Sequence, residues 1–136
     1  MSRAALIATC LLLLASCWKD NSCNTPFGEG ATVDVAMPEF AALQGVGGSL
    51  TINRGHHGIF VRRTGFADFV AFECTCPNDH DERLEADSDW GGAVLQCPVC
   101  GSRFETEDGT PLSGSVTPCR LYQYSTAFDG VTLTIY

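Results

Sequence analysis

Two close pairs of cysteines constrain this chain more than any other feature. Cys74 and Cys76 are separated by one residue, and Cys97 and Cys100 are separated by two. Each pair follows an apolar, strand-like run and leads into a turn, so two loops that carry two thiols each can close over one centre. Soft thiolate sulfur in sets of four selects zinc or iron-sulfur clusters over hard cations. The pattern therefore bounds the chemistry of the site without choosing the metal.

The first residues of the chain predict export. Ala4–Ala15 is an apolar run of the length of a signal-peptide core, about 12 residues, whereas a helix that spans a bilayer needs roughly 20. The sequence Leu14-Ala15-Ser16-Cys17 resembles a bacterial lipobox. This resemblance implies that residues 1–16 are a lipoprotein signal peptide and that Cys17 carries lipid that anchors the protein to the bilayer. Trp18 in place of aspartate implies the outer membrane in a Gram-negative host, on its periplasmic or surface face.

The remaining length and charge predict one acidic domain. Removal of the signal peptide leaves about 120 residues, enough for a single core. We expect residues 17–30, which include Asn, Ser, Thr, Pro and Gly, to form the lipidated N-terminus and a tether, and residues 31–136 to form the domain. The formal net charge of −8 argues against nucleic acid as a partner, because phosphate binding needs clustered Lys and Arg.

The cysteine count predicts one further pairing. Of eight cysteines, Cys10 leaves with the signal peptide and Cys17 is lipidated. Once the two close pairs are set aside, Cys23 and Cys119 remain. In an oxidising compartment these two are candidates for a disulfide. The alternative is that one of them is a small buried thiol.

Most of the domain has the pattern of short strands. They are rich in β-branched and aromatic residues and are bounded by Gly, Pro, Asn and Asp, which predicts an all-β sandwich or small barrel. One segment, Pro38–Leu43, could form a helical turn that Gly45 ends. Phe60, Phe69, Phe72, Phe104 and Tyr124 lie in strand-like runs and are expected in the core. The expected strands are 32–36, 49–53, 58–63, 69–73, 92–96, 103–106, 121–126 and 131–136.

Over residues 31–136 the order of these parts resembles the Rieske domain. Rieske proteins carry Cys-x-His on one loop and Cys-x-x-His on a second loop, and these residues grip a 2Fe-2S cluster. The same spacings occur here, and residues 101–118 resemble the family's continuation of a glycine, an aromatic strand, an Asp-Gly turn and a small-residue stretch with proline. The resemblance implies a Rieske-like antiparallel β-sandwich with a two-loop metal- or cluster-binding tip. The implied ligands are Cys74 and Cys97 on the inner iron, and Cys76 and Cys100 on the outer iron.

The chain departs from the Rieske pattern in its ligand chemistry. Cysteine stands at positions 76 and 100, where the family has histidine. Histidine ligation raises the potential to about −150 to +300 mV, whereas an all-thiolate cluster of plant type lies near −400 mV. We therefore expect a low-potential carrier of single electrons that serves a redox protein partner, and no quinol oxidation.

Two alternatives remain open for the cysteines. Cys97-Pro98-Val99-Cys100-Gly101 also has the sequence of a zinc-binding knuckle, so the four thiols could hold a structural zinc ion. They could also be paired as disulfides, which would leave a binding module without redox activity. Because no hydrolytic motif is present, a carrier or binding domain is favoured over an enzyme with its own substrate.

Other polar residues favour solvated loops over sites. His56 and His57 lie in a glycine-flanked turn, and His80 lies in a Pro-Asn-Asp turn where metal ligation is the less favoured interpretation. The acidic residues between the two cysteine pairs lack the alternation of a calcium-binding EF-hand loop. They are Asp79, Asp81, Glu82, Glu85, Asp87 and Asp89.

Overall fold

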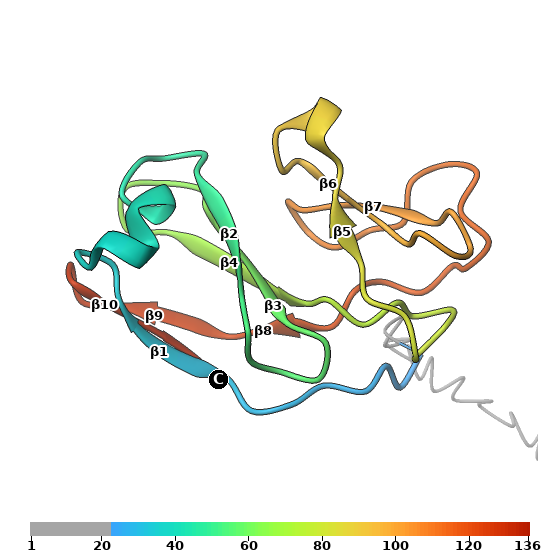
Figure 1. Ribbon diagram of the computed structural model, residues 1–136, viewed down its shortest axis with the longest axis horizontal. Helices are drawn as coiled ribbons and strands as arrows, with labels where there is room; N and C mark the ends of the chain where they lie inside the picture. Colours follow the sequence, from blue (N-terminus) through green and yellow to red (C-terminus); the bar gives the residue numbers. More distant parts are fainter. Residues whose placement is uncertain (1–22) are drawn as a thin grey trace, which may run out of the picture.

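The computed structural model describes residues 23–136, which form three antiparallel sheets (Figure 1). This arrangement confirms the expected all-β, antiparallel fold. The first sheet has the order β1-β10-β9, the second β2-β3-β4-β8 and the third β5-β6-β7. The strands are β1 (Ala31–Asp34), β2 (Ser49–Ile52), β3 (Ile59–Arg63), β4 (Phe69–Glu73), β5 (Glu85–Ala86), β6 (Val94–Gln96), β7 (Arg103–Glu105), β8 (Gln123–Tyr124), β9 (Thr126–Phe128) and β10 (Thr132–Ile135).

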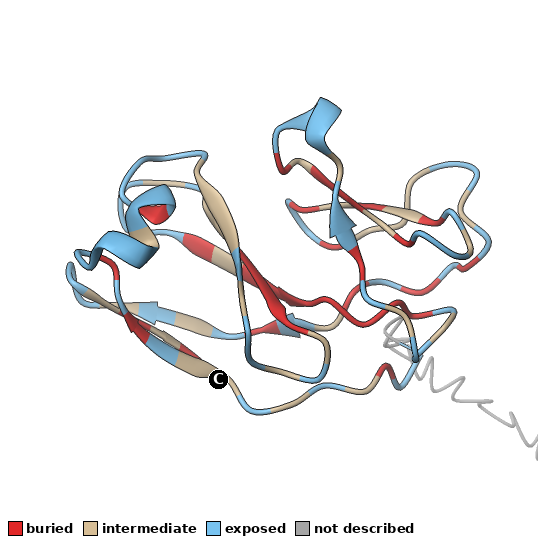
Figure 2. Ribbon diagram, in the orientation of Figure 1, coloured by how far each residue is buried: buried red, intermediate tan, exposed pale blue. Residues whose placement is uncertain are grey.

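The second sheet lies between two hydrophobic cores. Side chains alternate across a strand, so Ile59 and Val61 of β3 face the core shared with the first sheet, whereas Phe60 faces the core shared with the third sheet. In β4, Ala71 and Phe72 divide in the same way. Strands covered on both faces are apolar at successive positions, which explains the unbroken runs of β3 and β4. Figure 2 shows the buried residues concentrated along these two strands.

The second core leads directly to the cysteines. It contains Phe60, Phe72 and Phe104 together with Leu95 and Cys97. All five expected core aromatics are buried in the structure, which confirms that prediction. The cysteine loops therefore lie at the end of a packed core, where the second and third sheets meet.

Three local features differ from the expectation. The expected helical turn is a 3-10 helix, η1 (Pro38–Leu43), and a second short 3-10 helix, η2 (Ser88–Trp90), was not expected. Strand β5 was missed because its two residues are exposed and lie in the acidic stretch. The run expected over 121–126 divides between β8 and β9, which belong to different sheets. None of the helices within residues 23–136 is long and apolar enough to cross a membrane.

The segment before β1 follows the surface of the fold. Cys23 is joined to Cys119 by a disulfide, with 5.6 Å between their Cα atoms. Phe27 stacks on Tyr122 with 3.9 Å between ring centroids, and the Gly28 N–H donates to the Tyr124 hydroxyl at 3.2 Å. Residues 23–30, expected as part of a tether, are thus held against the domain (Figure 1).

Candidate metal centre

The first cysteine loop continues the alternation of β4. Phe72, Cys74 and Cys76 all belong to the second core, so the sulfurs at i and i+2 lie on the same side of an extended segment. Glu73 and Thr75 lie between them, and they bond to each other through the Thr75 hydroxyl at 3.0 Å. The Cys-x-Cys spacing therefore places both cysteine side chains in the second core.

Backbone hydrogen bonds hold this loop on both sides. The Cys74 N–H donates to the Gly58 carbonyl at 2.8 Å, and the Leu84 N–H donates to the Cys74 carbonyl at 2.7 Å. The Cys76 N–H donates to the Glu82 carbonyl at 2.9 Å. Cys74 and Cys76 are fully buried, so the loop is fixed before any ligand binds.

The second cysteine loop is a tight turn between β6 and β7. The Gly101 N–H donates to the Cys97 carbonyl at 3.0 Å, and the Cys97 N–H donates to the Ser102 carbonyl at 2.9 Å. Gly101 has a φ of 73°, a left-handed conformation in which a side chain would be strained. The backbone conformation of the turn therefore explains why glycine follows the second cysteine. The turn also brings the two ends of the Cys-x-x-Cys segment together.

Three of the four expected ligands converge. The sulfurs of Cys76, Cys97 and Cys100 all lie within 4.8 Å of one another. The Cys76 and Cys100 sulfurs are 3.7 Å apart. Two thiolates on one tetrahedral metal with bonds of about 2.3 Å are separated by about 3.8 Å. The Cys76–Cys100 pair therefore already has the spacing that a shared metal requires.

Cys74 lies outside this group of three sulfurs. Its sulfur contacts the Thr51 side chain and the Phe60 backbone, on the second sheet. Cys74 is fully buried within the same core, where its thiol packs as a small apolar side chain would. The four-cysteine ligand set remains a prediction, and Cys74 is the member whose side chain must turn to complete it.

The thiols differ in acidity. Burial raises the pKa of Cys74 to about 12, and the charge of Glu73 adds to this effect. Burial also raises the pKa of Cys76 to about 12, aided by the hydrogen bond with Cys97. Burial acts in the same direction on Cys100, but hydrogen bonds from the Ser102 side chain and backbone outweigh it and place its pKa below the usual value. Cys100 therefore ionises before Cys74 and Cys76, and a bound cation must displace the protons of these two buried thiols.

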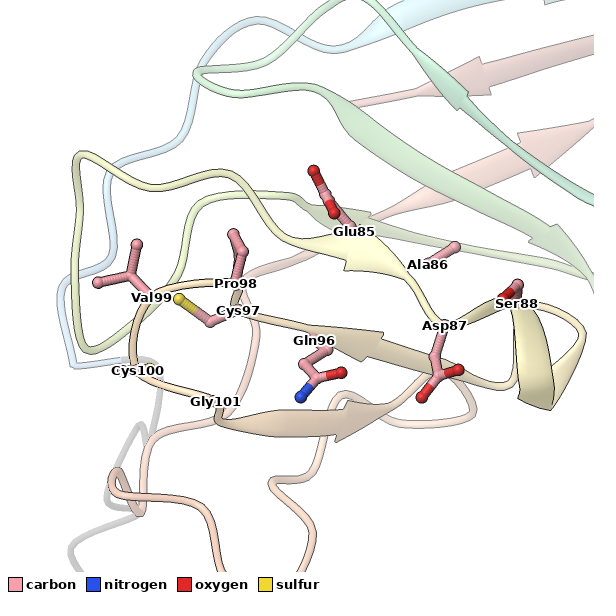
Figure 3. A pocket seen from close by; sticks show the side chains of 10 residues that line it. All are labelled: Glu85, Ala86, Asp87, Ser88, Gln96, Cys97, Pro98, Val99, Cys100 and Gly101. Carbon is pink, nitrogen blue, oxygen red and sulfur yellow. The ribbon is translucent and has the colours of Figure 1, made fainter.

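A cleft of about 480 Å³ opens beside the second loop (Figure 3). Cys97–Gly101 close one end of it, Gln96 lies along one side, and Glu85–Ser88 line the other side. Cys100 is half-buried, whereas Val99 is 61 % exposed. The second loop is thus the part of the site that meets solvent, and Cys100 is the thiol that lies nearest to it.

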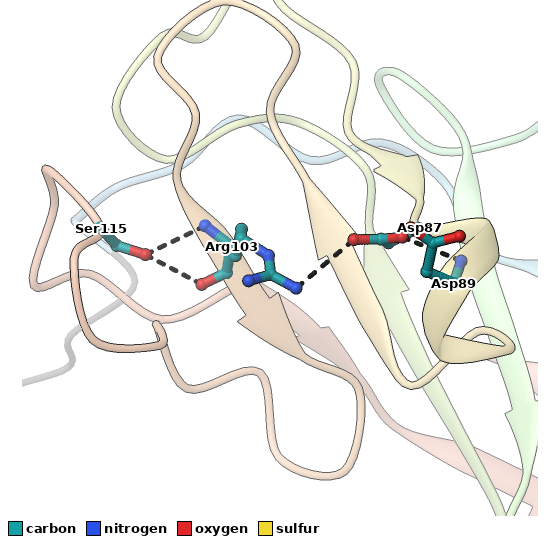
Figure 4. Close-up of polar contacts among 4 residues, drawn as sticks. All are labelled: Asp87, Asp89, Arg103 and Ser115. Carbon is teal, nitrogen blue, oxygen red and sulfur yellow. Dashed lines mark hydrogen bonds and ion pairs between the residues drawn. The ribbon is translucent and has the colours of Figure 1, made fainter.

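An ion pair supports the third sheet behind this cleft. The Arg103 guanidinium lies 3.4 Å from Asp87, and Ser115 bonds to both the N–H and the carbonyl of Arg103 at 3.0 Å (Figure 4). Asp87 also accepts from the Asp89 N–H at the start of η2. Trp90 is 57 % exposed, and its ring lies 5.4 Å from the Arg103 guanidinium.

A buried carboxylate that the sequence did not reveal supports the first loop. Glu73 is fully buried and accepts four hydrogen bonds. The donors are the His56 and His57 N–H groups at 2.8 Å, the Thr75 hydroxyl at 3.0 Å and the Tyr124 hydroxyl at 2.7 Å. The sequence signal for this network was an acidic residue in an otherwise apolar strand, because a buried charge needs hydrogen-bond partners.

The three histidines lie in turns, as expected, but two of them contact the first loop. The His56 Nδ1 lies 3.0 Å from the Thr75 hydroxyl, and the His57 Nε2 lies 3.1 Å from the His80 carbonyl. His80 is exposed and is not part of the sulfur group. The predicted signal peptide, Cys10 and the lipidation site Cys17 lie outside the described residues.

Comparisons with known proteins give a distant likeness. No protein-family model matches the sequence, and no curated protein is significantly similar to it. The chain is similar to a ferredoxin of carbazole 1,9a-dioxygenase from Nocardioides aromaticivorans IC177, with 22 % identity and a TM-score of 0.45, over 77 % of this chain and 96 % of that one. It is also similar to a chain in a complex of reduced oxygenase and oxidized ferredoxin in carbazole 1,9a-dioxygenase, with 24 % identity and a TM-score of 0.48, over 76 % and 92 %.

Proposed function

We propose that this protein is a Rieske-like carrier of single electrons that binds a 2Fe-2S cluster through Cys74, Cys76, Cys97 and Cys100. The observation that carries the proposal is the convergence of three thiols from two loops, all within 4.8 Å. Thiolates are the ligands that iron-sulfur clusters use.

The donor set fits such a group in its chemistry. Every candidate ligand is a thiol, and Cys76 and Cys100 have the spacing of two ligands on one metal. Cys74 faces the same core as the other sulfurs, so a rotation of its side chain, without a change of strand register, would bring it toward them.

When bound, the cluster would accept and release one electron at a time. The chain's own residues exclude water, because Cys74, Cys76 and Cys97 are fully buried. Cys100 and the exposed Val99 provide the approach for a redox protein partner. Thiolate ligands add negative charge compared with imidazoles, which favours the oxidised state and a low potential.

The test is metal and sulfide analysis of the full chain purified without oxygen, with absorption and EPR spectra. We expect two irons and two acid-labile sulfides per chain and an EPR signal that appears only on strong reduction. Cys100→Ser should lose the chromophore, whereas Glu39→Gln, an exposed change in η1, should keep it. Protein without iron, or a Cys100→Ser variant with its full spectrum, would contradict the proposal.

A second candidate is a structural zinc site in a binding module without redox activity. The compact arrangement of Cys76, Cys97 and Cys100, with Cys74 apart, also suits a single metal ion held by these three sulfurs. The same analysis separates the two candidates, since this one predicts one zinc per chain and no EPR signal. Absence of metal and of free thiols would instead indicate disulfide pairing.

We also propose that the protein is anchored in the bacterial envelope through lipid on Cys17. The lipobox-like sequence supports this. Incorporation of labelled fatty acid into the wild-type protein, and its loss in Cys17→Ser, would support the anchor. Unchanged labelling in that variant would exclude Cys17 as the site.

A further inference from the structure

Two arginines stand apart from the others in this acidic protein. Among the six arginines within residues 23–136, four make side-chain hydrogen bonds or ion pairs: Arg62, Arg63, Arg103 and Arg120. The guanidinium groups of Arg54 and Arg83 make neither with any residue in this part of the chain. Because the net charge is −8, carboxylates are abundant, and two unpaired arginines are not explained by a shortage of acidic partners.

Arg54 and Arg83 line the same cavity. It has a volume of about 210 Å³, roughly seven times the share of one water molecule in the liquid. A Cβ placed on Gly58 would lie 3.6 Å from the Arg83 Cζ, so the guanidinium lies close to the floor of the cavity. Its lining consists of Asn53, Arg54, Gly55, His56, His57, Gly58 and Arg83.

The floor of the cavity is preorganised. The Glu73 carboxylate accepts from the His56 and His57 N–H groups at 2.8 Å, which fixes the turn from below. Gly55 has a φ of 73°, and a Cβ there would lie 2.5 Å from the Glu73 Oε2. A binding site built on this turn therefore loses little conformational entropy when a ligand binds.

The hydrogen bonds of the two imidazoles define which nitrogens stay free. The Thr75 hydroxyl donates to Glu73, so it accepts from the His56 Nδ1 and leaves the His56 Nε2 free. The His57 Nε2 donates to the His80 carbonyl and leaves the His57 Nδ1 free. In neutral imidazoles both free nitrogens are acceptors, whereas both guanidinium groups are donors.

We propose that this cavity binds free inorganic phosphate. Arg54 and Arg83 donate to the anionic oxygens, and one of the two free imidazole nitrogens, on His56 or His57, accepts from the P–OH that hydrogen phosphate keeps at neutral pH. A phosphate monoester, whose second pKa is about 6, is mostly without this proton at neutral pH. Guanidinium groups match phosphate oxygens in geometry and charge. A fully ionised carboxylate or sulfate satisfies the arginines but offers no donor to the imidazoles. No cysteine lines this cavity, although the Gly58 carbonyl at its floor accepts from the Cys74 N–H at 2.8 Å.

The test is calorimetric titration of the full chain at neutral pH and constant ionic strength. The probes are inorganic phosphate, glycerol 3-phosphate and sulfate. We expect saturable binding of inorganic phosphate, and about tenfold or more weaker binding of sulfate and of glycerol 3-phosphate, because neither offers the P–OH donor when it is fully ionised. Tighter binding of glycerol 3-phosphate than of inorganic phosphate would contradict the P–OH contact.

Exposed arginines supply the variants and the control. Arg54→Gln and Arg83→Gln should each weaken phosphate binding about tenfold or more, since each removes a charge-assisted hydrogen bond. Arg120→Gln, which removes an arginine paired with Asp108 outside the cavity, should leave binding unchanged. No saturable binding of inorganic phosphate, equal binding of sulfate, or unchanged binding in both cavity variants would each overturn the proposal.

Discussion

At the scale of single residues, the thiols are alike in chemistry but differ in environment. Cys74 contacts the second sheet, Cys76 and Cys97 are buried at the loop ends, and Cys100 meets solvent. These environments give each cysteine a distinct expected effect when it is replaced.

We expect Cys76→Ala and Cys100→Ala to abolish metal binding, because each removes one of the two sulfurs 3.7 Å apart. Cys74→Ala separates the two candidate centres. In a cluster with four thiolate ligands it should abolish the chromophore, whereas a single metal held by the three grouped sulfurs should remain bound at one equivalent. Metal content by mass spectrometry, measured after gel filtration, checks all three variants. Retention of full metal by Cys100→Ala would exclude the sulfur group as the site.

The raised pKa values predict a stability loss in alkali. The pKa of Cys74 rises from 9.0 to about 12 on folding, so the folded state favours the protonated thiol. This contribution is fully present below pH 9 and is lost as the pH rises toward about 12. We expect the unfolding free energy of the metal-free protein to fall across this window in urea titrations. Cys74→Ala, which lacks the titrating group, should show a smaller fall, and an equal fall would contradict this assignment.

At the scale of elements, Glu73 joins strand β4 to the turn at residues 55–58 and to β8. It is the last residue of β4, and its partners Tyr124, His56 and His57 come from distant parts of the sequence. Its four hydrogen bonds satisfy a carboxylate that would otherwise be costly to bury.

Glu73→Ala should therefore destabilise the protein by about 3 to 5 kcal/mol, because it leaves four donors without their acceptor and opens a cavity. Glu73→Gln should cost less, since the amide oxygen still accepts from some of these donors. Urea unfolding measures both. Glu107→Gln, an exposed change, is the control, and a cost for Glu73→Ala no larger than that of the control would contradict the role of this network.

The elements were predictable to the extent that their signals are local. β3 and β4 were recognised by apolar and β-branched residues, and Gly101 by its place after the second cysteine. The orientation of the Cys74 side chain depends on packing against Thr51 and Phe60, which lie 23 and 14 residues earlier in the sequence. The Glu73 network depends likewise on amides 16 and 17 residues away. Such contacts follow from tertiary pairing, so a local pattern could not supply them.

At the scale of the whole molecule, the second sheet lies between two cores. The Cys23–Cys119 disulfide links the start of the described chain to its last part. The bonded cysteines are 96 residues apart. The disulfide also holds the segment that carries Phe27 and Gly28, which contact Tyr122 and Tyr124. Both contacts lie on the side of the fold where Tyr124 meets Glu73.

Loss of this disulfide should lower the unfolding free energy by about 4 to 5 kcal/mol in the chain-entropy model, with smaller values common in practice. Cys23→Ala and Cys119→Ala should each produce the effect, and the double variant should add little to either single variant. Denaturant unfolding of the oxidised proteins measures this. Single variants as stable as the wild-type protein would show that the disulfide does not contribute.

The position of Cys23 has a geometric consequence for how the protein would be presented to its surroundings. The chain enters the fold at the end that carries the cysteine loops, and η1 lies at the far end (Figure 1). A lipid anchor at Cys17, as proposed above, would attach six residues before Cys23, on the side of the fold that carries the thiols. An electron partner of the thiols would then meet them close to the membrane surface, which would favour partners that are themselves membrane-bound.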